Sequence, residues 1–174
     1  MLKQVWGILL LALLLGGLAS LPFWALQSNK AVNDDFLSLV NEDSEYAFVF
    51  FGFRGCGDVC PTTLSTLNLL IEQVKSTNIF PPAVLFIDID SNSNQEAAQA
   101  YVQLFNPDFL ALHPDKTQLK QFSDDFSLNF NQINDQISHM GRTYLLKKNE
   151  QSWYLINTYN PNTFSLSQLT SDIN

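Results

Sequence analysis

The stretch YAFVFFGFRGCGDVCPTTL, Tyr46 to Leu64, decides the fold of this chain and holds both of its cysteines, Cys56 and Cys60. Its first eight residues are continuously apolar and glycines follow, which is typical of a central parallel strand buried on both faces. From Pro61, apolar residues recur at three- and four-residue steps and predict a helix to about Ser76 with Pro61 at its first position. These residues are Leu64, Leu67, Leu70, Ile71 and Val74.

The rest of the chain alternates strand and helix patterns, which predicts a three-layer α/β domain around a central mixed sheet. The polar and mixed segment before Tyr46 contains one short apolar group, Phe36 to Val40, that we expect to pack on the domain as a helical turn. Further strands are expected at residues 83–90 and 109–112 and in a hairpin turning at residues 149–151, and further helices at 93–105, at 115–126 and from near Thr163.

Residues 4 to 29 carry no charged side chain, and this run is about long enough to cross a bilayer. Lys3 precedes it and Asp34 follows, so we expect a single-pass anchor in a bacterial inner membrane with the domain on the exported, periplasmic side. Small residues around Ala19 leave a cleaved signal peptide as the alternative. The expected organisation is an anchor or signal segment at 1–27, a linker and lead-in at 28–45, and the α/β domain at 46–174.

The charge of the chain excludes one large class of partners. It carries 17 acidic and 9 basic residues, for a formal net charge of −8. Such a chain is poorly suited to the phosphate backbone of a nucleic acid, whereas a cation or a basic protein surface is an easier target. We therefore expect no nucleic-acid partner.

Two cysteines separated by three residues are compatible with a structural disulfide, a redox pair or a metal site. Residues at i and i+4 of a helical segment lie about 5–6 Å apart, and a disulfide needs Cα atoms about 4.4–6.8 Å apart. The cysteine loop leaves the carboxyl end of a parallel strand, where α/β sheets form their sites. The helix start at Cys60 favours a thiolate and Arg54 supports it, whereas Asp58 opposes it.

His139, just before a strand, is the third candidate ligand. Two thiolates and an imidazole form a soft set that suits Cu(I) and leaves Zn(II) short of a fourth ligand, which Met140 or a water could supply. We expect Asp88 and Asp90 to lie near the cysteines, with Asp90 as a candidate to support the ligands. His113 (in LHPDK) is expected to be an ordinary loop residue.

The segment FFGFRGCGDVCPTTL resembles the metal loop of the Sco/SenC copper-delivery proteins, where an apolar strand and Phe-Gly-aromatic precede Cys-x-Asp-Val-Cys-Pro. The resemblance continues through FIDID and FNPDFLAL and reaches SHMGRTYLL, which is similar to the family's Asp-His-Ser/Thr-x-x-x-Tyr-Leu. It covers about residues 46 to 173. It implies a thioredoxin-like fold, a membrane tether, and binding of copper, as Cu(I) or Cu(II), by Cys56, Cys60 and His139.

The same resemblance implies a function in building the dinuclear copper site of cytochrome c oxidase. The chain would hand copper to the subunit that carries this site or to another exported client. The alternative is a thiol–disulfide oxidoreductase in which Cys56 attacks a client disulfide and Cys60 resolves the intermediate.

Three features depart from the family pattern. Residues 27–45 are short and poor in strand pattern where the family has a leading hairpin, Gly57 replaces a common proline, and Ser138 replaces the aspartate before the histidine. The last change removes a partner that would orient the imidazole, so we expect weaker metal binding with all three ligands retained.

Overall fold

The computed structural model describes Trp6, Gly16 and residues 30–32, 36–77, 80–133, 136–150 and 152–173. The chain divides into two compact units, Met1–Lys30 and Ala31–Asn174. Apart from Trp6 and Gly16, the predicted membrane anchor at 1–27 lies outside the described residues. Within those described residues, no helix combines the length and apolar character needed to cross a membrane.

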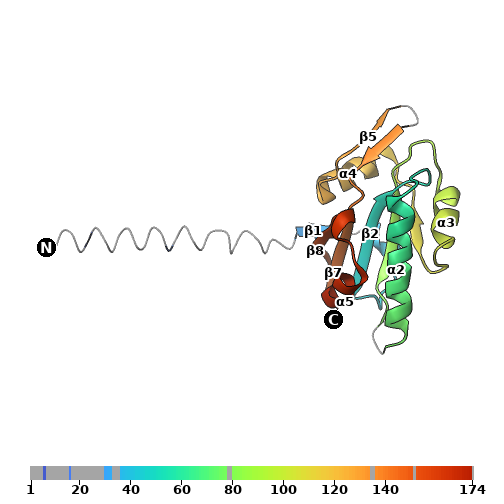
Figure 1. Ribbon diagram of the computed structural model, residues 1–174. Helices are drawn as coiled ribbons and strands as arrows, with labels where there is room; N and C mark the ends of the chain where they lie inside the picture. Colours follow the sequence, from blue (N-terminus) through green and yellow to red (C-terminus); the bar gives the residue numbers. More distant parts are fainter. Residues whose placement is uncertain are drawn as a thin grey trace. The chain divides into compact units, whose positions relative to one another are not determined.

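A six-stranded mixed sheet forms the centre of the larger unit (Figure 1), in the order β1-β8-β7-β2-β3-β4. β2 (Tyr46–Gly52), β3 (Ala83–Asp88) and β4 (Leu110–Leu112) run parallel to one another. β7 (Thr143–Asn149) runs antiparallel to β2, and β8 (Ser152–Tyr159) runs antiparallel to β7. The predicted α/β fold class with a central mixed sheet is confirmed.

Helices cover both faces of this sheet because the side chains of β2 alternate between two hydrophobic cores. Phe48 and Phe50 pack with α2 (Val59–Lys75), α3 (Gln95–Gln103) and α5 (Leu166–Asp172). Val49 and Phe51 pack on the opposite face with α4 (Lys116–Phe126). All four of these side chains are at most 3% exposed, so β2 is the buried central strand that its sequence predicts.

The lead-in segment contributes to the second core. β1 (Lys30–Val32) is the edge strand next to β8, and η1 (Leu37–Leu39) is the helical turn predicted from the apolar group that follows. Phe36 is buried, and its ring meets the ring of Phe122 edge-on with centroids 4.7 Å apart. Residues expected to link anchor and domain therefore also pack on the sheet.

Two local features differ from the prediction. α2 begins at Val59 rather than Pro61, so Cys60 lies within its first turn. A second hairpin, β5 (Phe130–Ile133) and β6 (Gln136–His139), forms a two-stranded sheet of its own. Its strands alternate between half-buried and exposed residues, and its polar FNQI and QISH sequences carry little of the apolar signal that identifies a strand.

Two glutamines of α3 occupy the hydrogen-bonding groups at the outer edge of β4. The Gln99 amide donates to the carbonyl of Phe109 at 2.8 Å and accepts from the N–H of Ala111 at 2.9 Å. Gln95 makes the same pair of bonds one step further, to the Ala111 carbonyl and the His113 N–H, both at 2.8 Å. Side chains thus take the place of a further strand along this edge.

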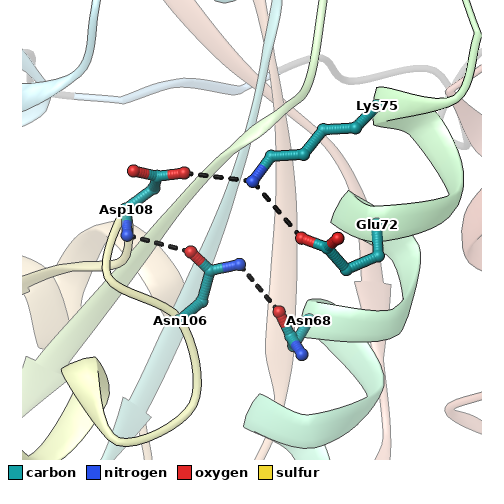
Figure 2. A network of polar contacts seen from close by, with 5 residues as sticks. All are labelled: Asn68, Glu72, Lys75, Asn106 and Asp108. Carbon is teal, nitrogen blue, oxygen red and sulfur yellow. Dashed lines mark hydrogen bonds and ion pairs between the residues drawn. The ribbon is translucent and has the colours of Figure 1, made fainter.

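The far end of α2 is tied to the loop between α3 and β4 by the polar network in Figure 2. The Asn106 amide donates to Oδ1 of Asn68 at 2.7 Å, and Oδ1 of Asn106 accepts from the Asp108 N–H at 2.9 Å. Lys75 pairs with Asp108 at 3.2 Å and with Glu72 at 3.3 Å. The ion pairs are exposed and stabilise little, whereas Asn106 is buried and orients the loop.

Candidate metal centre

Cys56 and Cys60 meet His139, which lies far from them in the sequence, at the carboxyl end of β2. One ligand atom from each, the two sulfurs and a ring nitrogen, lie within 4.8 Å of one another. Cys60 is buried, while Cys56 and His139 are half-buried. These are the three ligands predicted from the sequence. Among the described residues, no other group of three or more His, Cys, Asp or Glu side chains gathers in this way.

The cysteine loop begins with a tight turn at the end of β2. The N–H of Cys56 donates to the carbonyl of Phe53 at 3.1 Å, which closes a tight turn directly after the strand. Arg54, Gly55, Gly57 and Asp58 are all exposed. The loop therefore lies at the surface around the half-buried Cys56, while Cys60 lies in the core.

Burial sets the protonation of Cys60. It raises the pKa of the thiol well above its ordinary value, and the hydrogen bond to Cys56 raises the pKa further. The helix start does not overcome these effects. Cys60 is therefore a protonated thiol near neutral pH, and it must lose its proton to bind a metal.

His139 ends β6 and is held by contacts on two sides. Its ring meets the ring of Phe53 edge-on, with centroids 5.5 Å apart. The N–H of Gly141 donates to Nδ1 of His139 at 3.0 Å. Burial lowers the pKa of the imidazole, so the ring stays neutral, the form in which histidine binds metals.

Gly141 fits this position because it has no side chain. Its φ is +60°, and a Cβ would lie 2.6 Å from Cγ1 of Val59, the first residue of α2. The turn that follows His139 therefore packs closely against α2, the helix that carries Cys60. This contact places His139 close to the cysteines.

The donor set and spacing fit a soft metal ion. With bonds of about 2.3 Å to sulfur and about 2.0 Å to nitrogen, three ligands around one ion lie roughly 4 Å apart. The observed spacing of at most 4.8 Å needs only a small contraction. Two thiolates and an imidazole are soft ligands of the kind that bind copper.

The remaining candidates are not part of this group of three. Asp88 lies near Cys60, as predicted, because its charge contributes to the raised pKa of that thiol. Asp88 is 1% exposed, and burial raises the pKa of its carboxyl. Asp90 contacts the second hairpin rather than a ligand, because its Oδ1 accepts from Nε2 of Gln132 at 3.2 Å. His113 lies beyond β4 and outside the ligand group. Met140 is 48% exposed beside His139, and its role as a fourth ligand stays a prediction.

Sequence reasoning missed three residues that shape this site: Gly52, Gln132 and Gly141. Two are glycines whose importance depends on side chains of other elements, and no local pattern marks Gly141. Gln132 belongs to the hairpin that was not predicted. Only the Phe-Gly-aromatic pattern around Gly52 gave a signal.

Comparison with known proteins supports the family resemblance seen in the sequence. Residues 32–174 match the family model described as SCO1/SenC. The SCO2-like protein RP587 of Rickettsia prowazekii is 31% identical over 137 residues, which cover 74% of this chain and 64% of that protein.

Solved structures share the fold. The copper-bound ScoI of Arabidopsis thaliana superposes with a TM-score of 0.65 at 20% identity, over 75% of this chain and 82% of that one. BsSco superposes with a TM-score of 0.56 at 19% identity, over 74% of this chain and 78% of that one. It is described as having a disulfide switch and as a member of the Sco family of cytochrome c oxidase assembly proteins. This chain belongs to the SCO1/SenC family.

Proposed function

We propose that this protein is a copper chaperone that binds one Cu(I) through Cys56, Cys60 and His139 and delivers it to an exported client. The observation that carries the proposal is the convergence of two thiols and one imidazole within 4.8 Å. The copper-bound Arabidopsis relative has the same fold, which supports copper as the metal.

The proposed client is the copper-site subunit of cytochrome c oxidase. The name of BsSco places that relative among oxidase assembly proteins, and membership of the SCO1/SenC family supports the same role here. The uncharged run at residues 4–29 supports attachment to a bacterial inner membrane, with the domain on the periplasmic side.

The exposure of the loop suggests how copper would leave. Cys56 is half-buried and lies between exposed residues, whereas Cys60 is in the core. A client thiolate would approach the ion from the side of Cys56, bind it as a further ligand and displace the protein ligands in turn. The ion stays Cu(I) throughout, and the client thiol gives up a proton as the Cys60 thiolate regains one.

A transfer experiment tests delivery. The soluble domain, residues 29–174, is loaded with one Cu(I) and mixed anaerobically with the reduced, copper-free domain of an oxidase copper subunit. After chromatographic separation, the proposal expects the copper to be on the client. Copper that stays on this protein at equilibrium with a folded, reduced client contradicts a delivery function.

A second candidate is thiol–disulfide exchange, favoured by the contact between the two unbridged thiols, Cys56 and Cys60. Cys56 is the more accessible sulfur and would attack a client disulfide, forming a mixed disulfide and releasing one client thiolate. Cys60 would then attack Cys56 and release the second. The client gains two electrons, and this protein ends with a Cys56–Cys60 disulfide.

Trapping separates this candidate from copper delivery. Cys60→Ser lacks the resolving thiol, so a client should accumulate as a mixed disulfide with Cys56, while Cys56→Ser should trap far less. Absence of any mixed disulfide with Cys60→Ser in cells that express the client would reject the exchange reaction. His139→Ala should leave trapping nearly unchanged, because the imidazole has no part in that step.

A further inference from the structure

The hairpin β5–β6 brings His139 to the cysteines, yet it belongs to no strand ladder of the main sheet. Within the hairpin, Phe130 pairs with His139 and Gln132 pairs with Ile137. An isolated two-stranded hairpin is marginally stable in water. The position of His139 therefore depends on how side chains fix this hairpin to the domain.

We infer that Gln132 is a positioning residue for the His139 ligand, because its amide ties the β5–β6 hairpin to the end of β3. Nε2 of Gln132 donates to Oδ1 of Asp90 at 3.2 Å, and Oε1 accepts from the N–H of Ser91 at 3.1 Å. The inference rests on the proposed function insofar as His139 binds copper. Gln132 itself is not a metal ligand.

The other end of this tie is firmly held. Asp90 follows Ile89, which is 2% exposed and whose N–H donates to the Gly52 carbonyl at 2.9 Å. The same Oδ1 of Asp90 accepts from the N–H of Asn92 at 2.9 Å. The carboxylate is thus fixed in a turn that continues the strand next to β2, and Gln132 couples the hairpin to that turn.

Apolar packing gives the hairpin a weaker hold. Phe130 and Ile137 are only partly buried where they meet the second core. The alternate residues Asn131, Ile133, Gln136 and Ser138 are exposed. Of the described hydrogen bonds, those of Gln132 join the strands of the hairpin to Asp90 and Ser91, in the turn after β3. The N–H of Gly141, which follows the hairpin, donates to Nδ1 of His139.

A double-mutant cycle tests whether Gln132 acts through His139. In the full protein, Gln132→Ala should weaken Cu(I) binding roughly tenfold, as expected when a residue that orients a ligand is lost. In the His139→Ala background the same change should have no further effect. Asn131→Ala, on the exposed face of the same strand, is the matched control and should bind like the wild type.

Gln132→Glu distinguishes a hydrogen-bonded tie from simple packing. Glutamate keeps the size of the side chain but cannot donate to Asp90 and adds a like charge beside it. It should weaken Cu(I) binding at least as much as Gln132→Ala. Wild-type affinity in either variant, or an equal loss in the His139→Ala background, would overturn the inference.

A metal-free measurement keeps this result separate from the proposed function. In the copper-free protein, Gln132→Ala should speed amide hydrogen exchange at Gly141, whose N–H donates to His139, roughly tenfold relative to the α2 core, because the hairpin opens more often. Unchanged exchange rejects the tie even if copper binds. Faster exchange in a protein that binds no copper upholds the tie and rejects the chaperone.

Discussion

Gly52 leaves the space that Sγ of Cys60 occupies. A Cβ at this position would lie 2.8 Å from that sulfur and 2.9 Å from the Phe86 ring. The last residue of the central strand thus determines where the Cys60 sulfur lies. The glycine is required here by close approach rather than by its backbone conformation.

Gly52→Ala should therefore lower both the stability of the fold and the affinity of the site for Cu(I). The added methyl group must displace either the sulfur or a packed ring, which costs about 1–3 kcal/mol of folding free energy. We expect Cu(I) affinity to fall at least about tenfold, because a ligand atom moves. Chemical denaturation and chelator competition measure the two effects. Wild-type copper affinity in a folded Gly52→Ala protein would show that the space left by Gly52 for the Cys60 sulfur is unimportant for metal binding.

Copper affinity should rise with pH. The pKa of Cys60 is raised by burial, so at neutral pH each binding event releases the Cys60 proton, and the affinity should increase about tenfold per pH unit for that proton. The pKa of His139 is lowered, so its ring adds little competition from protons until the pH falls below about 6.5. Competition titrations between about pH 6 and pH 8 test this. A flat profile would mean that Cys60 does not bind as a thiolate.

The lowered pKa of His139 also has a consequence for folding. The unfolded chain binds a proton at His139 more readily than the folded one, so this residue stabilises the copper-free protein above about pH 6.5 and less as the pH falls. His139→Ala should flatten the pH dependence of the unfolding free energy across that range. Denaturation series at several pH values, with and without the substitution, measure the difference. An identical slope in both proteins would contradict the burial of this ring.

Copper binding should break the hydrogen bond from Gly141 to His139. The amide occupies the lone pair of Nδ1 at 3.0 Å. If copper binds Nδ1 it displaces the amide. If copper binds the other nitrogen, Nδ1 gains the ring proton and can no longer accept. The Gly141 amide resonance should shift on loading with Cu(I), while that of Ala47 in β2 should not. An unmoved Gly141 signal in the loaded protein would exclude His139 as a ligand.

The glutamines at the β4 edge should matter for stability and for solubility. Gln99→Ala removes the partners of the Phe109 carbonyl and the Ala111 N–H, which should cost about 1–3 kcal/mol. Gln103 is exposed on the same helix, so Gln103→Ala is the matched control and should change stability by less than about 0.5 kcal/mol. Combined loss of Gln95 and Gln99 should also favour self-association at the opened edge. Equal stability of both single variants would contradict this role.

The sequence was sufficient for the parts of the fold that carry strong local patterns. The apolar run at Tyr46 predicted β2 as the central strand, and the leucine spacing after Pro61 predicted α2, with its start placed two residues late. Cys60 therefore lies inside the helix, a difference that an N-terminal proline could not reveal. The grouping of Cys56, Cys60 and His139 was predicted from their chemistry and from the resemblance to a known family.

The missing parts depend on contacts between distant residues. The β5–β6 hairpin consists of short polar strands stabilised by Gln132 and by partial burial of Phe130, and neither signal is visible in a window of sequence. The same holds for Gly141, whose need to be glycine comes from Val59 in another element. The raised pKa of Cys60 likewise required knowledge of its burial, because the helix start alone favours the opposite shift.

The most direct test of the central claim is an anaerobic Cu(I) titration of the reduced domain, residues 29–174, against a competing chelator. His139→Ala is measured beside His113→Ala, which replaces the other histidine of the chain. We expect one tightly bound Cu(I) in the wild type and in His113→Ala. Affinity should fall roughly a hundredfold or more in His139→Ala, because a ligand is lost rather than misplaced. Equal affinity in the two variants would contradict the proposed Cys56, Cys60 and His139 site.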